Sequence, residues 1–228
     1  MTLVLASASP RRRELLAWLG LPFEIDPAAV VEPLPERHRH PERVARALAR
    51  QKAAVVAHRR PGDWVVAADT VVVFRGHLLG KPETAEEARA MLRLLRGRWH
   101  RVITGVAVAR GARFWVDHAT TWVRMREYSE ADIAASIARG EPFDKAGGYA
   151  IQDPDLRPVA EWRGCYCNVV GLSIWLTWWL LRRSGWELSV PQRLPAVCHT
   201  CPLAVDSLRG HSPDDASQLE RPAFNATE

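Results

Sequence analysis

The sequence lacks any apolar run long enough to cross a membrane. The longest, Val169–Leu181, has 13 residues and contains Gly171, Ser173 and Thr177, whereas a membrane-spanning helix needs about 20 apolar residues. A secretory leader is not expected either, because the basic residues Arg11–Arg13 follow the short apolar N-terminal stretch instead of preceding it. These absences predict a cytoplasmic protein with no membrane partner.

Lysine is scarce. Only Lys52, Lys81 and Lys145 are present, so 28 of the 31 basic residues are arginine. Lysine carries a compact, mobile ammonium group, whereas the arginine guanidinium is a planar fork, and the two are not interchangeable at a binding site. The three lysines therefore indicate places that require an ammonium group. The alternative is that they are remnants with no common role.

The sequence also lacks a strong excess of one charge. Its 31 basic and 26 acidic residues give a net charge of +5, and acidic residues are interspersed among the arginines. This dispersion is typical of a solvated surface, whereas a nucleic-acid groove needs a basic patch. The ten tryptophans lie mostly in apolar segments, where core packing explains them better than base stacking. No stable nucleic-acid partner is expected.

Only four cysteines are present, in the pairs Cys165/Cys167 and Cys198/Cys201. The second pair has the C-x-x-C spacing of half a zinc or redox site, but no second C-x-x-C accompanies it. Three interpretations stay open. Cys198 and Cys201 bind zinc, with help from His199 or from the first pair; they form a regulatory disulfide; or the thiols have no role.

Apolar periodicity and turn residues predict a mixed α/β fold. The expected helices are 10–19, 41–58, 84–95, 129–139 and 172–183, and the expected strands are 2–6, 64–68, 71–74, 102–109 and 114–125. Residues 21–40 are rich in proline and are expected to be irregular. The order of these elements favours a mixed sheet over a purely parallel one.

The composition changes at about Ser189, beyond which Pro, Ser, Asp and Glu dominate and no periodicity persists. Together with the length, this change divides the chain into a domain over residues 1–188 and a C-terminal extension over residues 189–228. The extension carries the C-x-x-C pair and is expected to be flexible.

The segment Ser7–Arg13 joins the first expected strand to the first expected helix. Backbone N–H groups at a helix N-terminus favour an anion, and two hydroxyl and three guanidinium groups add further donors. Cations in a first helical turn oppose the helix dipole, so an anionic partner is favoured. The segment therefore predicts a polyphosphate clamp. The alternative is an ordinary helix cap followed by a basic turn.

Two acidic residues are candidates for the chemistry. Asp69 follows an apolar strand, where a carboxylate can reach a cleft and bind Mg²⁺ or take a proton from water. Its alternative role is to cap a turn. Glu32 lies in the irregular segment, and its surroundings alone predict a solvated side chain. The lysines lie in three further candidate segments, a helix, a turn and a glycine-containing loop, at Lys52, Lys81 and Lys145.

Taken in order, eight blocks of the sequence resemble the Maf family of nucleoside triphosphate pyrophosphatases, over about residues 2–186. They are LASASPRRRELL (5–16), ARQKA (49–53), AADTVVV (67–73), LGKP (79–82), A-x-x-ML-x-x-L-x-G (88–97), H-x-VITGVAV (100–108), GEPFDKAGGYAIQ (140–152) and NVVGLS (168–173). The resemblance implies an elongated, two-lobed, ITPase-like α/β fold with a twisted mixed sheet and a central cleft. It also implies a homodimer.

The resemblance implies hydrolysis of the α–β phosphoanhydride of a nucleoside triphosphate, with Mg²⁺ or Mn²⁺ as the cofactor. By position, Asp69 matches the general base and Glu32 the second acidic residue, and both are expected to hold the metal ion. Lys52 and Lys81 match catalytic positions that contact the phosphates. The remaining matches are the phosphate-contacting Ser7, Arg12 and Arg13, and the positions associated with base choice, Arg11, Thr70 and Gln152.

Three markers resemble the branch that acts on dTTP and UTP: Asp-Thr at 69–70, Lys145 and Ile-Gln at 151–152. The 7-methyl-GTP branch usually has Asp-Gln, a cysteine in place of this lysine and a glutamate near the glutamine. Two alternatives stay open: the same chemistry on 7-methyl-GTP or a modified nucleotide, and a nucleotide-binding regulator of septum formation or cell division. Asp153-Pro154-Asp155 departs from the family pattern and bears on the base pocket.

Overall fold

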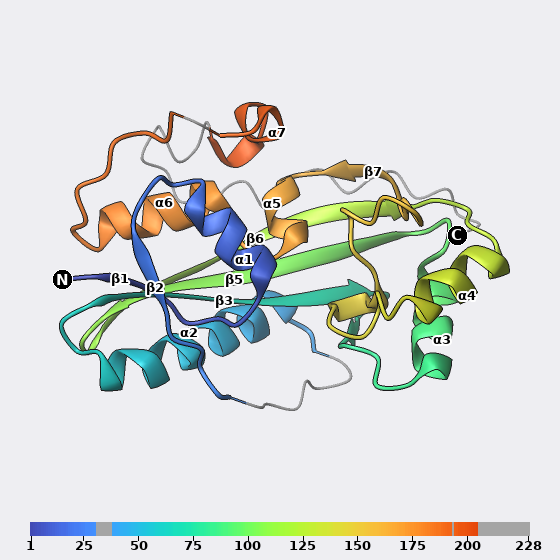
Figure 1. Ribbon diagram of the computed structural model, residues 1–228, viewed down its shortest axis with the longest axis horizontal. Coiled ribbons are helices and arrows are strands. Elements are labelled where there is room, and N and C mark those ends of the chain that lie inside the picture. The colour runs from blue at the N-terminus through green and yellow to red at the C-terminus, as the bar shows by residue number, and fades with distance from the viewer. Residues whose placement is uncertain (31–37, 193, 205–228) are drawn as a thin grey trace.

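Three long strands run along most of the molecule and form the centre of one sheet. They are β3 (Trp64–Phe74), β5 (Trp99–Arg110) and β6 (Arg113–Met125), and each is antiparallel to the next. Figure 1 shows them twisting along the longest axis of the computed structural model, which describes residues 1–30, 38–192 and 194–204. The three strands are the scaffold on which the helices pack.

Four short strands complete the sheet. The strand order is β2-β1-β3-β5-β6-β7, with β4 paired to β3. Their bounds are β1 (Leu3–Leu5), β2 (Phe23–Ile25), β4 (His77–Leu79) and β7 (Val159–Arg163). The pairs β1–β2 and β1–β3 are parallel and the other pairs are antiparallel, which confirms the predicted mixed sheet. The edge strands β2 and β7 are largely exposed, so they lack the apolar pattern that would have predicted them.

One edge of β3 is interrupted in its middle. β1 pairs with the residues up to Val66, and β4 pairs from Val72 onward. Over residues 67–71, β3 has no strand neighbour on that side among the described elements. Asp69 and Thr70 are the two residues of β3 that are not fully buried. The gap in the sheet edge therefore exposes these two polar side chains.

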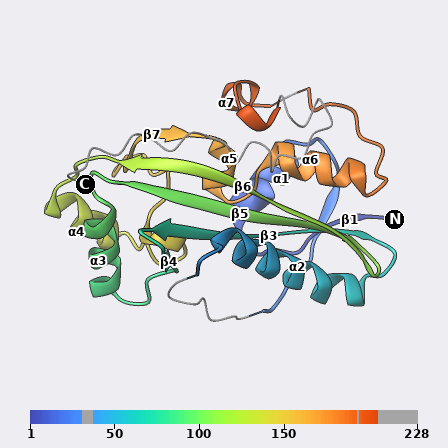
Figure 2. The ribbon, with the colours of Figure 1, turned by 180° about the vertical axis from the view of Figure 1, so that it is seen from behind.

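Helices cover both faces of the sheet at the end that holds the N-terminus. Figures 1 and 2 show α2 on one face and α1, α5 and α6 on the other. The bounds are α1 (Pro10–Ala17), α2 (Pro41–Arg59), α5 (Tyr166–Val170) and α6 (Ile174–Arg183). The helix predicted over 172–183 is confirmed as α6, whereas the short helix α5, which ends at Gly171 with a φ of 129°, was not predicted.

The approach of α2 to the sheet depends on Gly105 in β5. A Cβ atom at this position would lie 2.2 Å from the carbonyl oxygen of Ala45 and 2.7 Å from the backbone nitrogen of Arg46. The helix meets the sheet with small buried side chains, among them Ala45, Ala49 and Ala53. This close contact fixes the position of Lys52, which lies on the same helix.

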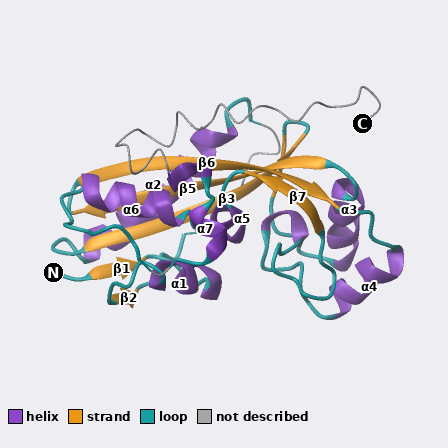
Figure 3. Ribbon diagram, turned by 90° about the horizontal axis from the view of Figure 1, so that it is seen from above, coloured by secondary structure: helices purple, strands orange, loops and turns teal. Residues whose placement is uncertain are grey.

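A second set of elements packs at the other end of the sheet. α3 (Ala85–Leu95), α4 (Glu130–Ala138) and the 3₁₀ turn η1 (Ala146–Gly148) lie there, as Figure 3 shows for the two helices. Their apolar residues join those of the sheet in a separate core that includes Val72, Leu92 and Tyr149. The elongated mixed sheet, with separate sets of helices and separate hydrophobic clusters at its two ends, confirms the expected two-lobed α/β fold.

The start of the C-terminal extension belongs to the folded unit. α7 (Ala196–His199) lies beside α6, and the buried residues Leu194, Cys198, Cys201 and Leu203 share its hydrophobic core. The indole N–H of Trp175 donates a hydrogen bond to the carbonyl oxygen of Cys198 at 2.9 Å. The boundary expected at residue 189 therefore does not separate a packed domain from an unpacked extension, because a few apolar side chains in a polar stretch suffice to pack it. Residues 205–228 lie outside the described residues.

None of the helices in the described part of the chain combines the length and the apolar character that a membrane crossing requires.

Candidate active site

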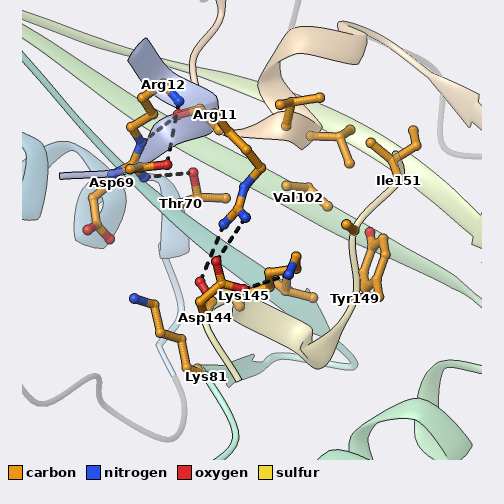
Figure 4. Close-up of a pocket in the computed structure, with 18 of the residues that line it drawn as sticks. Arg11, Arg12, Asp69, Thr70, Lys81, Val102, Asp144, Lys145, Tyr149 and Ile151 are labelled. Atoms are coloured by element: carbon orange, nitrogen blue, oxygen red, sulfur yellow. Dashed lines mark hydrogen bonds and ion pairs between the residues drawn. The ribbon is translucent and has the colours of Figure 1, made fainter. Parts of the chain in front are cut away.

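A cavity of about 670 Å³ opens at the gap in the β3 edge. Segments that are far apart in the sequence meet around it: α1, α2, β3, the loop after β4 and the loop before β7 (Figure 4). The charged residues among its described lining are Arg11, Arg12, Lys52, Lys81, Lys145, Asp69, Glu83 and Asp144. Five of these are cations and three are carboxylates, so the lining favours a polyanionic ligand.

All three lysines of the chain line this one cavity. Lys52 comes from α2, Lys81 from the turn after β4 and Lys145 from the loop before η1. The three candidate segments that the sequence analysis named for these lysines therefore meet around one space.

The first turn of α1 points its donors at the cavity. The Ser9 side chain caps the helix by accepting a hydrogen bond from the backbone N–H of Arg12, and Pro10 occupies the first helical position. The Ser7 hydroxyl accepts the N–H of Ser9 at 3.2 Å. Because this first turn contains no acidic residue, the positive end of the helix dipole and the arginines act together on an anion.

Arg12 is held in place by three hydrogen bonds. Its Nε donates to the carbonyl oxygen of Gly171 at 2.9 Å, and its two terminal nitrogens donate to the hydroxyls of Thr70 at 3.3 Å and Ser7 at 3.4 Å. Burial lowers the pKa of Arg12, and the nearby Asp69 carboxylate opposes that shift. Arg12 is thus a preorganised cation in a partly dry environment, where electrostatic attraction to an anion is strong.

Asp69 and Lys52 form an ion pair at the wall of the cavity that β3 and α2 share. Their side chains are 14% and 22% exposed, so the pair faces the cavity and not the core. In this pair the ammonium group of Lys52 neutralises the carboxylate of Asp69. A phosphate that attracts Lys52, or a cation that binds Asp69, would compete for this pair.

Arg11 reaches across the cavity to Asp144, which lies in the loop before η1. The guanidinium donates to the carboxylate at 2.9 Å, and Lys145 donates to the same carboxylate at 2.6 Å and to the carbonyl oxygen of Glu141 at 2.5 Å. Burial favours a higher pKa for Asp144, but the hydrogen bonds from Lys145 and Arg11 outweigh burial and hold the pKa below its ordinary value. Figure 4 shows this bridge between the two walls. An anionic ligand must compete with Asp144 for both cations.

One side of the cavity is apolar. Figure 4 shows Val102, Tyr149 and Ile151 together on that side, and Val72 and Val170 also belong to the lining. A flat, partly apolar ring would pack favourably against such a wall. A phosphate would lose its hydration there without gaining polar partners. The cavity therefore has a cationic end and an apolar end, the pattern that a nucleotide requires.

Tyr149 is oriented by a buried histidine. His100 Nε2 and the Tyr149 hydroxyl lie 2.6 Å apart, and the two rings meet edge to face. Burial lowers the pKa of His100 to about 3, so this side chain is neutral at physiological pH. The pair fixes the ring of Tyr149 at the apolar end.

The low pKa of His100 predicts a pH dependence of stability. Below about pH 6.5 the unfolded chain binds a proton at His100 that the folded chain excludes, so the folded state loses stability as the pH falls toward 3. Between pH 6.5 and 4, this residue should contribute a loss of about 3 kcal/mol. In urea unfolding, the His100→Gln variant should therefore show a flatter profile over this range than the natural protein.

The matched control is His58→Gln, which removes an exposed histidine from α2. It should keep the natural pH profile. If His100→Gln keeps the same slope as the control, His100 is not the group responsible.

The other sequence-predicted residues lie at or beyond the margins of the cavity. Gln152 is exposed at its rim. Ser7 is buried and reaches the site through Arg12, whereas Arg13 is exposed and is absent from the described lining. Glu32 lies outside the described residues. Asp153 turns away from the cavity, because its carboxylate accepts the backbone N–H groups of residues 155 and 156.

Sequence reasoning did not single out Asp144 and Tyr149 as site residues. Both lie in the block GEPFDKAGGYAIQ, next to the predicted Lys145. The block marked the loop as functional, but which of its side chains face the cavity depends on the turn at Gly147, which has a φ of 75°. His100 is the first residue of the block H-x-VITGVAV, but the sequence analysis gave this side chain no role.

Comparisons with known proteins place the sequence among relatives. The family model described as Maf-like protein matches residues 2–184. A dTTP/UTP pyrophosphatase from Thermomicrobium roseum is 79% identical over 206 residues, which is 90% of this chain and 94% of that protein. A protein of the same name from Gloeobacter violaceus is 46% identical over 172 residues, 75% of this chain and 90% of that protein.

A solved structure described as a nucleoside-triphosphatase / dITP/XTP pyrophosphatase from Mycobacterium abscessus covers 56% of this chain and 76% of its own, at 17% identity and a TM-score of 0.36. The Thermomicrobium match is longer than residues 1–188, so it includes part of the C-terminal extension. The family model spans most of the sequence and both relatives match nearly their whole length, so the chain belongs to the Maf family.

Proposed function

We propose that the protein hydrolyses dTTP and UTP to the nucleoside monophosphate and pyrophosphate. The proposal rests on the cavity. Its lining combines five cations and the carboxylate of Asp69 with an apolar side. The curated relatives named dTTP/UTP pyrophosphatase support the choice of substrate.

The triphosphate occupies the cationic end of the cavity. Arg12 and the N-terminus of α1 bind it from one wall, and Lys52 and Lys81 bind it from the others. Arg11 exchanges Asp144 for a phosphate oxygen, because a phosphate carries more charge than one carboxylate. These contacts leave the α-phosphate near Asp69.

Asp69 is the general base. It takes a proton from the water that attacks the α-phosphorus, and the bond between this phosphorus and the α–β bridging oxygen breaks. The electron pair stays on pyrophosphate, whose added charge Arg12, Lys52 and Lys81 neutralise. When Lys52 moves from Asp69 to the phosphates, the carboxylate becomes available to the water.

The donor set at this site fits a divalent cation such as Mg²⁺ or Mn²⁺. Magnesium is commonly held by one or two carboxylates together with phosphate oxygens and water, and Asp69 supplies one carboxylate. Glu32 is proposed as the second ligand on the family resemblance. When bound, the cation neutralises phosphate charge and acts as a Lewis acid.

The apolar end receives the base. Arg11, Thr70 and Gln152 are proposed to influence base choice, together with the wall around Tyr149. The Thr70 hydroxyl lies 2.9 Å from that of Thr104 and accepts a hydrogen bond from Arg12. Thr70 therefore also positions Arg12, so its replacement should affect phosphate binding as well as base choice.

A panel of triphosphates with detection of released pyrophosphate tests the proposal. With Mg²⁺ or Mn²⁺, dTTP and UTP should give kcat/KM values at least about tenfold above those for 7-methyl-GTP and the purine triphosphates, which corresponds to about 1.4 kcal/mol. Preference for 7-methyl-GTP or a modified nucleotide would identify a different substrate. Tight binding with negligible turnover would instead support a nucleotide-binding regulator of division.

Two further properties belong to this proposal. We infer a cytoplasmic role in clearing the nucleotide pool, because the substrates are metabolites of that compartment. We also infer a homodimer, on the family resemblance. Light scattering of the full chain tests the second inference, since a single mass of about 25.6 kDa would contradict it.

A further inference from the structure

All four cysteines of the chain meet in one buried cluster outside the active site. Cys165 and Cys167 lie at the start of α5, and Cys198 and Cys201 lie in and just after α7. Each is between 1 and 5% exposed. The sequence left the second pair without a partner, whereas the fold brings a C-x-C and a C-x-x-C pair together from segments about 30 residues apart.

The sulfur atoms contact one another. Cys167 Sγ and Cys198 Sγ lie 3.2 Å apart, and the Cys165 thiol is within hydrogen-bonding contact of both Cys167 and Cys201. All four cysteines are free, so no disulfide accounts for the cluster. Chance burial of cysteine as a small apolar residue does not require thiols from two segments to converge.

Polar groups around the cluster are directed at sulfur. The backbone N–H of Asn168 donates to Cys165, the backbone N–H of Leu203 donates to Cys201, and the Cys165 thiol donates to the Ser173 hydroxyl at 3.6 Å. Outer-shell hydrogen bonds of this kind accompany metal ligands and orient them.

We propose that Cys165, Cys167, Cys198 and Cys201 bind one structural Zn²⁺ ion. Four cysteine ligands are typical of closed, structural zinc sites, and C-x-x-C is a usual ligand spacing. The ion would fasten α7 and the start of the C-terminal extension to α5. This site is independent of the catalytic cation, which takes oxygen ligands at Asp69.

The sulfurs must spread slightly to admit the ion. Zinc–sulfur bonds of about 2.3 Å place the sulfurs of a tetrahedral site about 3.8 Å apart, whereas Cys167 and Cys198 are at 3.2 Å. No set of three or more His, Cys, Asp or Glu side chains among the described residues is already arranged around a metal position, so the proposal requires the sulfurs to move. A shift of about half an ångström per pair lies within the reach of small cysteine χ1 rotations.

Metal analysis of the full-length protein tests the proposal. The protein is purified with a thiol reductant and without added chelator, and its zinc content is measured by mass spectrometry. We expect about one zinc ion per chain and its loss in Cys198→Ser. The control Thr200→Ala, which changes an exposed residue between the two ligands, should retain the zinc. Removal of zinc from the natural protein should lower the melting temperature, because metal binding is coupled to folding.

Cobalt(II) reconstitution keeps the test valid if a cysteine variant does not fold. The natural protein loaded with Co²⁺ should show the intense visible absorption of tetrahedral thiolate coordination. Absence of zinc together with four titratable thiols would mean that the cysteines only pack, and two titratable thiols would mean that one pair of them forms a disulfide. Either result overturns the proposal. None of these measurements depends on the proposed hydrolysis, so the two proposals can fail separately.

Discussion

The Asp69→Asn variant should lose about 10²–10⁴-fold in kcat for dTTP and UTP, because removal of a general base has effects of this size. The change keeps the size of the side chain and removes its charge. Lys52 then loses its partner at the wall of the cavity and becomes more available to phosphate, so KM should rise little or even fall. Steady-state kinetics with pyrophosphate detection measure both parameters.

The matched control is Glu42→Gln, which also removes a carboxylate from a half-buried ion pair. Glu42 binds Arg101 at 2.8 Å, and it is absent from the described lining of the cavity. Its kcat should stay within about twofold of the natural value. If Asp69→Asn retains more than half of the natural rate, Asp69 is not the base. A shift of its melting temperature far beyond that of the control would point to a structural role.

The largest loss of stability is expected for Gly105→Ala. Its new Cβ atom would lie 2.2 Å from the carbonyl oxygen and 2.4 Å from the carbonyl carbon of Ala45. These are backbone atoms of α2, so no side-chain rotation relieves the contact and the whole helix must move. Overpacking of a core costs about 1–3 kcal/mol and sometimes more, and a backbone contact this short belongs at or beyond the upper end. Chemical unfolding measures the loss.

Gly62→Ala is the control for this change. An added Cβ atom at Gly62 meets nothing within 4 Å, so the free energy of unfolding should change by less than about 1 kcal/mol. Displacement of α2 also moves Lys52, so Gly105→Ala should lower kcat in the fraction that still folds. Equal stability of the two variants would show that α2 approaches the sheet less closely than described.

Strong local signals predicted much of this fold. Helix starts at Ser9-Pro10, Thr84 and Ser129 were readable because each has a side chain that caps the backbone. The edge strands β2 and β7 could not be predicted, since their largely exposed residues lack the alternation of apolar and polar side chains that marks a half-buried strand. The packing of residues 194–204 was missed because it depends on tertiary contacts with α6, which composition does not report.

The site residues were predicted from the chemistry of particular residue types more than from the hydrophobic periodicity of the sequence. The scarcity of lysine selected three side chains that line one cavity, and the Ser7–Arg13 segment contributed Arg11 and Arg12 to it. Asp144 and Tyr149 were not singled out, because their importance comes from partners that are distant in sequence, Arg11 and His100. The convergence of the four thiols also depends on contacts between segments that are distant in sequence. The sequence analysis therefore left the zinc site as one of three open interpretations of the cysteines.

The three long strands pass through both lobes without a linker between them. Nine residue pairs join β3 to β5 and twelve join β5 to β6. Any widening of the cavity must therefore bend a continuous ladder of hydrogen bonds. Such a ladder resists bending along its whole length. In the described part of the chain, no linker divides these three strands, so we expect small elastic bending of the sheet. The rate of nucleotide exchange should accordingly be governed by the Arg11–Asp144 bridge across the mouth and only weakly by the viscosity of the solvent.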